Sequence, residues 1–153
     1  MTFPTFPMSP VYEASVQGLM ALHSLTLLGR EDGDEADALR DSLEDPWFRL
    51  SSQEKRRITG LSADLDSIGA EPQLLPSITL ASQRGLVKAV ESRKSGEWDV
   101  ALDLLREWSD FIDPVLLAQL RGTVWEEAGH PEVAALFLNE ASRLESITPS
   151  HAS

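Results

Sequence analysis

The chain has 153 residues, of which 42% are hydrophobic and 25% are charged, and its formal net charge is −12. A chain this acidic repels phosphate backbones and anionic lipids, which argues against nonspecific binding to nucleic acid or to a membrane surface. It has no cysteine, so disulfides, thiolate catalysis and cysteine-based zinc sites are excluded. The hydrophobic and charged fractions are those of an ordinary globular protein.

The two ends of the chain are predicted to be tails. Residues 1–10 contain three prolines, which block regular hydrogen bonding and predict an extended segment. This segment has no basic residue and no long apolar run, unlike a signal peptide. Residues 147–153 are mostly small and polar and predict a frayed end. No apolar stretch approaches the roughly 20 residues of a membrane span. We therefore expect a cytoplasmic protein.

Three helices are predicted in an N-terminal segment, residues 11–69. The first covers about residues 11–28 and ends at Gly29. After a polar loop, Asp34 is expected to cap a short second helix that ends before Pro46. The inward-facing residues of these two helices are predicted to be Val11, Ala14, Gly18, Leu22, Leu25 and Leu28, followed by Ala36, Leu39 and Leu43.

The third helix has a clear start signal. Ser51 is followed three residues later by Glu54, which is the spacing of a capping box. Its apolar residues, Ile58, Leu61, Leu65 and Ile68, step by three or four, and Gly69 closes it. Two prolines then fall within residues 70–76, which predicts a linker.

The C-terminal half, residues 77–146, predicts two helical hairpins. Gly96 and Gly129 break the hairpins, and Pro114 and Pro131 suit first-turn positions. The four helices are expected at about residues 77–95, 97–109, 114–128 and 131–145.

This half also carries an internal repeat with a period of roughly 33 residues, a length typical of helical-hairpin arrays. Matching residue types recur at this one spacing in four pairs: Ala89 with Gly122, Gly96 with Gly129, Ala101 with Ala134, and Leu105 with Leu138. The small side chains allow helices to approach closely, and the glycines suit the left-handed cap that ends a first helix.

The second copy resembles the tetratricopeptide-repeat family. The family's order of small residue, aromatic, glycine, alanine, large apolar residue and alanine is seen in Gly122, Trp125, Gly129, Ala134, Leu138 and Ala141. The first copy departs from it, because Ser92 replaces the aromatic and Trp108 the last alanine. The closing proline is shifted to Pro114 in the first copy and is Ser146 in the second. The resemblance covers about residues 80–146. An unrelated helix bundle is the alternative.

The N-terminal segment has a weaker resemblance. Residues 34–65, with Asp45, Pro46 and Trp47, are similar to N-terminal regions of uncharacterised bacterial repeat proteins, a likeness that implies no activity. Because two hairpins alone seldom bury enough core, we expect the three-helix segment to pack on them. The predicted fold is therefore all-α, a tetratricopeptide-like array with an N-terminal three-helix segment packed on it.

The resemblance implies a partner-binding groove lined by the first helix of each hairpin. It would be formed by Gln83, Leu86, Val90, Arg93, Lys94, Leu116, Gln119, Thr123, Glu126 and Glu127. The lysines and asparagines that grip a peptide carboxylate in some family members are replaced here by apolar or neutral side chains. An apolar helix or extended segment is therefore the expected occupant. The alternative is that Leu86 and Val90 are core residues facing the N-terminal helices.

Other candidate sites have simpler interpretations. The histidines, His23, His130 and His151, lack zinc-site spacing, and no metal or cofactor is expected. The acidic run Asp32, Asp34, Glu35 and Asp37 lacks the ligand ladder of a calcium loop. Lys55, Arg56 and Arg57 are expected to form a salt-bridged helix face. Of the four tryptophans, Trp47 is the one expected to be partly exposed and to anchor a contact, while Trp98, Trp108 and Trp125 are expected in the core.

The leading functional hypothesis is a non-catalytic protein–protein interaction module, an adaptor or accessory subunit of a larger bacterial complex. It would bind a segment of another protein in a short helical groove. No nucleophile constellation, phosphate loop or dinucleotide fingerprint is present, so an enzyme is not expected. Two alternatives stay open: a small acidic secretion-type chaperone for an apolar client segment, and a self-assembling homo-oligomer.

Overall fold

The computed structural model describes residues 9–69 and 79–147, and these two ranges are all-α, as predicted. They hold seven α-helices and one short 3-10 helix, with no strand in either range. The chain divides into two compact units, Thr5–Gly69 and, with Met1–Pro4, Ala70–Ser153. We call their described parts the N-terminal unit and the C-terminal unit and treat each by itself. The predicted linker, residues 70–76, lies outside the described residues, as do nearly all of the two predicted tails.

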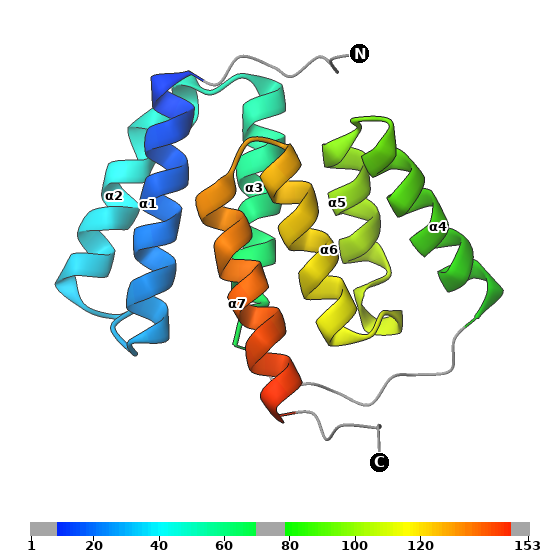
Figure 1. The fold of residues 1–153 in the computed structure, drawn as a ribbon. Helices are drawn as coiled ribbons and strands as arrows, with labels where there is room; N and C mark the ends of the chain where they lie inside the picture. The colour runs from blue at the N-terminus through cyan, green and yellow to red at the C-terminus, as the bar shows by residue number, and fades with distance from the viewer. Residues whose placement is uncertain (1–8, 70–78, 148–153) are drawn as a thin grey trace. The chain divides into compact units, whose positions relative to one another are not determined.

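The N-terminal unit contains α1 (Pro10–Leu27), α2 (Asp34–Arg49) and α3 (Ser52–Asp66). Helix α1 packs along both α2 and α3 (Figure 1), whereas, among these described helices, α2 and α3 do not pack along each other. The core residues are apolar side chains from all three helices: Tyr12, Val16, Leu25, Ala36, Ile58, Leu61 and Leu65.

The predicted capping box of α3 is confirmed. The Ser51 N–H donates to Glu54 Oε1 at 2.9 Å, and the Glu54 N–H donates to Ser51 Oγ at 3.1 Å. The start of α1 differs from the prediction, because Pro10 begins the helix rather than ending the tail. Ser9 caps it, since its Oγ accepts from the Tyr12 N–H at 3.1 Å. Proline suits this first position because its missing N–H would have no helical partner there.

The predicted boundaries of α2 were wrong at both ends. Gly33 is the N-cap, and Asp34 is the first helical residue, where its charge favours the helix dipole. Pro46 lies inside the helix, which continues to Arg49. A proline this near the end removes one backbone hydrogen bond, the one to the carbonyl four residues earlier, and leaves the rest of the helix intact. The extra turn carries Trp47 and Phe48.

The C-terminal unit contains two antiparallel hairpins (Figure 1). The first consists of α4 (Leu80–Lys94) and α5 (Trp98–Glu107), followed by the 3-10 helix η1 (Ser109–Phe111). The second consists of α6 (Pro114–Glu127) and α7 (Pro131–Ile147). The predicted second helix of this unit, which was expected to reach residue 109, ends at Glu107 because η1 follows it.

The two hairpin turns of the C-terminal unit have the same geometry. Gly96 and Gly129 have φ angles of 77° and 101°, a region that favours glycine. The N–H of the next residue reaches back to close the first helix, from Glu97 to the Ser92 carbonyl at 2.8 Å and from His130 to the Trp125 carbonyl at 2.9 Å. The internal repeat of the sequence is therefore also a repeat of backbone geometry.

At one pair of equivalent positions, the first hairpin has a glycine and a tryptophan where the second has two alanines. A Cβ built on Gly85 would overlap the indole ring of Trp108, so α4 packs with its backbone directly against this ring. The equivalent positions in the second copy of the repeat are Ala118 and Ala141, which are both buried in one core cluster. The departure of Trp108 from the repeat pattern thus has a physical reason, because Gly85 makes room for the larger ring.

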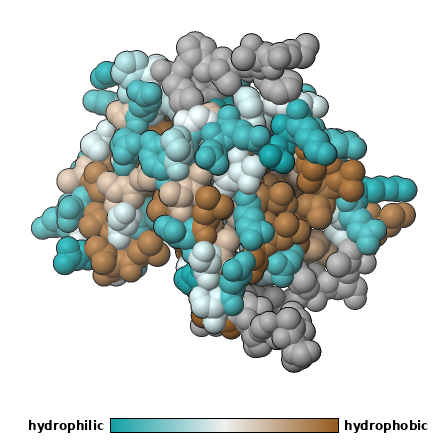
Figure 2. Space-filling model, in the orientation of Figure 1, coloured by the Kyte–Doolittle hydropathy of each residue, from teal (hydrophilic) through white to brown (hydrophobic). Residues whose placement is uncertain are grey.

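Hydrophobic side chains remain on the surface of both units. Figure 2 shows them in brown at the C-terminal end of α1 and over the region of α4 and α5. Leu27 and Leu28 are exposed at the end of α1, and Leu80 and Val87 are exposed on α4.

Candidate functional site

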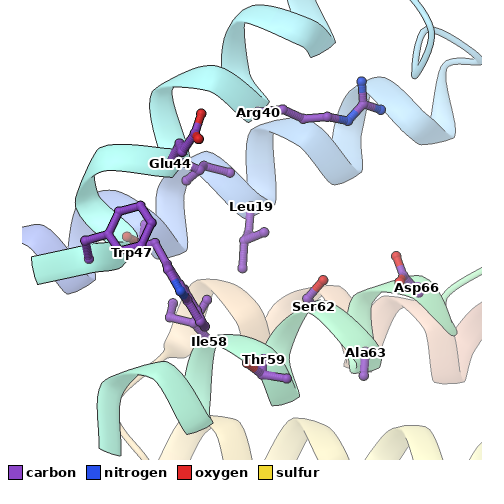
Figure 3. A pocket seen from close by; sticks show the side chains of 12 residues that line it. Leu19, Arg40, Glu44, Trp47, Ile58, Thr59, Ser62, Ala63 and Asp66 are labelled. Carbon is purple, nitrogen blue, oxygen red and sulfur yellow. The ribbon is translucent and has the colours of Figure 1, made fainter. Parts of the chain in front are cut away.

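The largest cavity described here is an open groove of about 580 Å³ in the N-terminal unit. Helices α2 and α3 form its walls and α1 its floor (Figure 3). It exists because α2 and α3 both pack on α1 but not along each other. We call it the α2–α3 groove, and its lining residues are Ser15, Leu19, Arg40, Leu43, Glu44, Trp47, Phe48, Ile58, Thr59, Ser62, Ala63 and Asp66.

One end of the groove is aromatic and apolar. Trp47 and Ile58 face each other there from opposite walls (Figure 3). Phe48 is 73% exposed, the largest exposed fraction among the large hydrophobic side chains described. Trp47 is half-buried, and the Lys55 Nζ lies 5.6 Å from its ring centroid, a cation–π distance that helps to hold the indole in place.

The other end and the rim carry charge. Arg40 donates to Asp37 Oδ1 at 3.0 Å and to the Glu31 carbonyl at 2.7 Å, so its charge is already compensated. Glu44 on α2 and Asp66 on α3 lie on opposite walls (Figure 3) and, among the described residues, make no ion pair or hydrogen bond. The rim therefore has two uncompensated carboxylates.

A second pocket, of about 220 Å³, continues the α2–α3 groove along α1 and α3. The two share Leu19, Arg40, Ser62 and Asp66. The second pocket reaches the C-terminal end of α1 at Leu27. Together they form one depression along much of α3, which is mainly apolar in the α2–α3 groove and more polar in the second pocket.

A buried carboxylate lies beside the aromatic end of the groove. Glu54 is buried at the start of α3, one turn before Ile58. Besides the Ser51 N–H, it accepts hydrogen bonds through Oε2 from Ser9 Oγ at 2.8 Å and from the Ser9 N–H at 3.3 Å. Burial raises the pKa of Glu54, but the hydrogen bonds from Ser51 and Ser9 outweigh it and leave the pKa below the ordinary value of 4.5. The first turns of α1 and α3 are thereby tied together.

The residues predicted to bind a partner in the C-terminal unit lie on a shallow face of α4 and α6. Leu86 and Val90 are half-buried, so they are neither fully core nor freely exposed. Arg93 Nε donates to Glu127 Oε1 at 2.6 Å, so two of the predicted residues pair with each other. The only pocket described beside them has a volume of about 10 Å³. The remaining predicted residues of this face are Gln83, Lys94, Leu116, Gln119, Thr123 and Glu126, all of them exposed except the half-buried Thr123.

The other candidate side chains do not form a site. His130 is buried with its ring 5.4 Å from that of Trp125. The three basic residues at 55–57 do not make one patch, because Arg57 is buried and Lys55 lies over Trp47. Within residues 9–69 and 79–147, no group of three His, Asp or Glu side chains is placed to hold a metal ion. His151 lies outside the described residues.

Trp47 was predicted from the sequence, but the groove around it was not. Leu43 and Trp47 are one helical turn apart, which was the available signal for a common face. That signal was lost because Pro46 was expected to end the helix before Trp47. The opposite wall, with Thr59, Ser62 and Asp66, has no sequence signal, because it depends on how far α2 and α3 diverge.

Comparison with known proteins gives no assignment: no family model, no curated protein and no solved structure matches this chain. In the part of the chain that the structure describes, no helix is both long and apolar enough to cross a bilayer.

Proposed function

We propose that the chain is a non-catalytic protein-interaction module, an adaptor or accessory subunit, whose N-terminal unit binds an apolar segment of a partner protein in the α2–α3 groove. The observation that carries this proposal is an open apolar groove of about 580 Å³ with Phe48 left 73% exposed on its wall. Exposed aromatic side chains at the edge of a pocket are typical anchors of protein interfaces.

The C-terminal unit has a different part in this proposal. We propose that it is a tetratricopeptide-like pair of hairpins that serves as a rigid scaffold. Support comes from the two glycine turns and from the close helix packing at Gly85 and Gly122. Its α4–α6 face, with a pocket of only about 10 Å³, offers a partner little concave surface.

The proposal is tested by affinity capture from an extract of the cells that make the protein. Three baits are compared: the wild type, Phe48→Asp, and the matched control Leu80→Asp. Leu80 is 62% exposed on α4, so both variants place the same charge on an exposed apolar position. Circular dichroism checks that each bait is folded. We expect Phe48→Asp to lose a partner that Leu80→Asp retains.

Two outcomes would contradict the proposed site. Retention of the partner by Phe48→Asp would remove the α2–α3 groove from the interface. Loss of the partner by a Leu86→Glu/Val90→Glu bait, together with its retention by Phe48→Asp, would move the interface to the α4–α6 face.

A further inference from the structure

We infer that the occupant of the α2–α3 groove is a short amphipathic helix that carries basic side chains along both edges of its apolar stripe. This inference rests on the proposed function and names the chemistry of the partner. It is carried by the shape of the groove, its length and the placement of its charges.

The shape of the groove favours a helix over an extended segment. An extended peptide gains affinity by adding main-chain hydrogen bonds to an open strand edge. Both walls and the floor here are helices, whose backbone groups bond within the helix, so the groove offers no such edge. Two helices that diverge over a third leave space for a fourth, which packs with its axis about 8–10 Å from theirs.

The length of the groove sets the length of the helix. On α3, the lining runs from Ile58 to Asp66, which is about 12 Å at a rise of about 1.5 Å per helical residue. The second pocket continues just past the end of α3 to Ile68, so the whole path is about 15 Å, or close to three turns of an occupying helix. The occupant therefore has about ten residues in contact, with apolar anchors at positions i, i+3 or i+4, and i+7.

The charges of the groove determine which side chains are expected along the two edges of the occupying helix. Glu44 and Asp66 stand uncompensated on opposite walls, while Arg40 is occupied by Asp37. Residues 9–69 carry 12 Asp or Glu and 6 Lys or Arg, a formal net charge of −6. An occupant with Lys or Arg on both sides of its apolar stripe would place one cation near each wall.

The same charges argue against a second copy of this chain as the occupant of the groove. The whole chain has a net charge of −12, so a second copy would bring further negative charge to an acidic rim. A partner of opposite sign is therefore favoured over self-association.

The test uses two synthetic peptides with the same leucine stripe, each of about 14 residues, a length at which an isolated helix begins to form in water. One has lysine and the other glutamate on both edges. Binding is followed by the indole N–H cross-peak of Trp47 in ¹⁵N-labelled full-length protein, assigned with Trp47→Phe. We expect the lysine peptide to shift this peak and to bind at least about tenfold more tightly than the glutamate peptide at low salt.

Two charge variants show whether the rim carboxylates cause the preference for the lysine peptide over the glutamate peptide. Glu44→Lys/Asp66→Lys should reverse it. Glu107→Lys/Glu145→Lys makes the same change in net charge on exposed positions of α5 and α7 and should leave it unchanged. Equal behaviour of the two variants would overturn the inference, since only nonspecific attraction would then remain. A lysine peptide interrupted by a central proline should bind weakly, and equal binding would overturn the helical part.

The remaining outcomes separate this inference from the proposed function. If neither peptide shifts Trp47 but capture of a partner still depends on Phe48, the named chemistry is wrong and the module stands. If capture does not depend on Phe48, the proposed site itself fails. A dimer that Phe48→Asp dissolves, or a Trp47 peak that moves when residues 1–8 are deleted, would assign the groove to the chain itself and overturn the inference.

Discussion

Both units are built from antiparallel α-helices, but the helices of the C-terminal unit pack closely, whereas those of the N-terminal unit leave an open groove. In the C-terminal unit, small residues let neighbouring helices close on one another, and the pocket beside α4 and α6 is only about 10 Å³. In the N-terminal unit, α2 and α3 share α1 as a support and leave a groove of about 580 Å³ between them. The difference teaches that an open site needs no special residue, only two helices that share a support without packing on each other.

The largest expected effect on stability comes from adding a methyl group at Gly85 in the C-terminal unit, compared with the same change at Gly18 in the N-terminal unit. A Cβ on Gly85 would overlap the Trp108 ring, whereas one on Gly18 would meet the Leu43 side chain, with Cδ2 at 2.6 Å and Cγ at 3.3 Å. Leu43 lines the groove and can rotate into it, but Trp108 is held against Phe111, with ring centroids 5.9 Å apart. We expect Gly85→Ala to lower the free energy of unfolding by about 2 kcal/mol and Gly18→Ala to change it little, measured by urea unfolding.

A double variant checks the cause of this effect. Gly85→Ala/Trp108→Ala recreates the pair found at the equivalent positions of the second hairpin, Ala118 and Ala141. If the clash explains the loss, the double variant should be no less stable than Trp108→Ala alone. Additive losses from the two substitutions would show that the indole does not limit the space at Gly85.

A smaller effect is expected from Glu54, the buried carboxylate beside the aromatic end of the groove. Glu54→Gln keeps the shape but replaces one accepting oxygen by an NH₂ group, so a donor of Ser9 or Ser51 loses its partner. We expect a loss of about 1 kcal/mol in the free energy of unfolding of the N-terminal unit near neutral pH. The exposed Glu13→Gln on α1 is the matched control and should have little effect.

The pH dependence of this loss follows from the lowered pKa of Glu54. Between the folded pKa and the ordinary value of 4.5, the unfolded chain binds more protons, so stability rises with pH in that window. The contribution of Glu54 is complete above pH 4.5 and disappears as the pH falls through the folded pKa. The difference in stability between wild type and Glu54→Gln should therefore narrow as the pH falls below 4.5, and a difference that stays constant until the protein unfolds in acid would contradict this account.

The sequence predicted the fold where local signals decide it. The Ser51 and Glu54 capping box and the glycine turns at 96 and 129 were all found from residue type and spacing, because each acts within a few residues. Gly85 and Trp108 show the limit. Their contact joins positions far apart along the chain, and nothing local in the sequence indicates that one residue makes room for the other.

The candidate site was harder to predict than the fold. Trp47 was identified, but α2 was expected to end before Pro46, because prolines usually follow the end of a helix. The last turn of α2, which completes one wall of the groove, was therefore not predicted. The predicted surface on α4 and α6 came from a family resemblance, and the groove that such families use depends on curvature over several repeats. Two hairpins give little curvature, so the same residues here form a shallow face.

The smallest expected effect concerns that shallow face. Arg93 and Glu127 form an ion pair whose side chains are 29% and 41% exposed, a setting in which such pairs contribute about 0.2–1 kcal/mol. A double-mutant cycle of Arg93→Ala and Glu127→Ala, measured by urea unfolding, should give a coupling energy in this range that shrinks with added salt. None of these variants should alter the shift of the Trp47 peak by the lysine peptide. If one of these variants binds the lysine peptide more tightly or more weakly than the wild type does at the same ionic strength, the face of α4 and α6 takes part in binding. The contrast between a binding unit and a scaffold unit would then no longer hold.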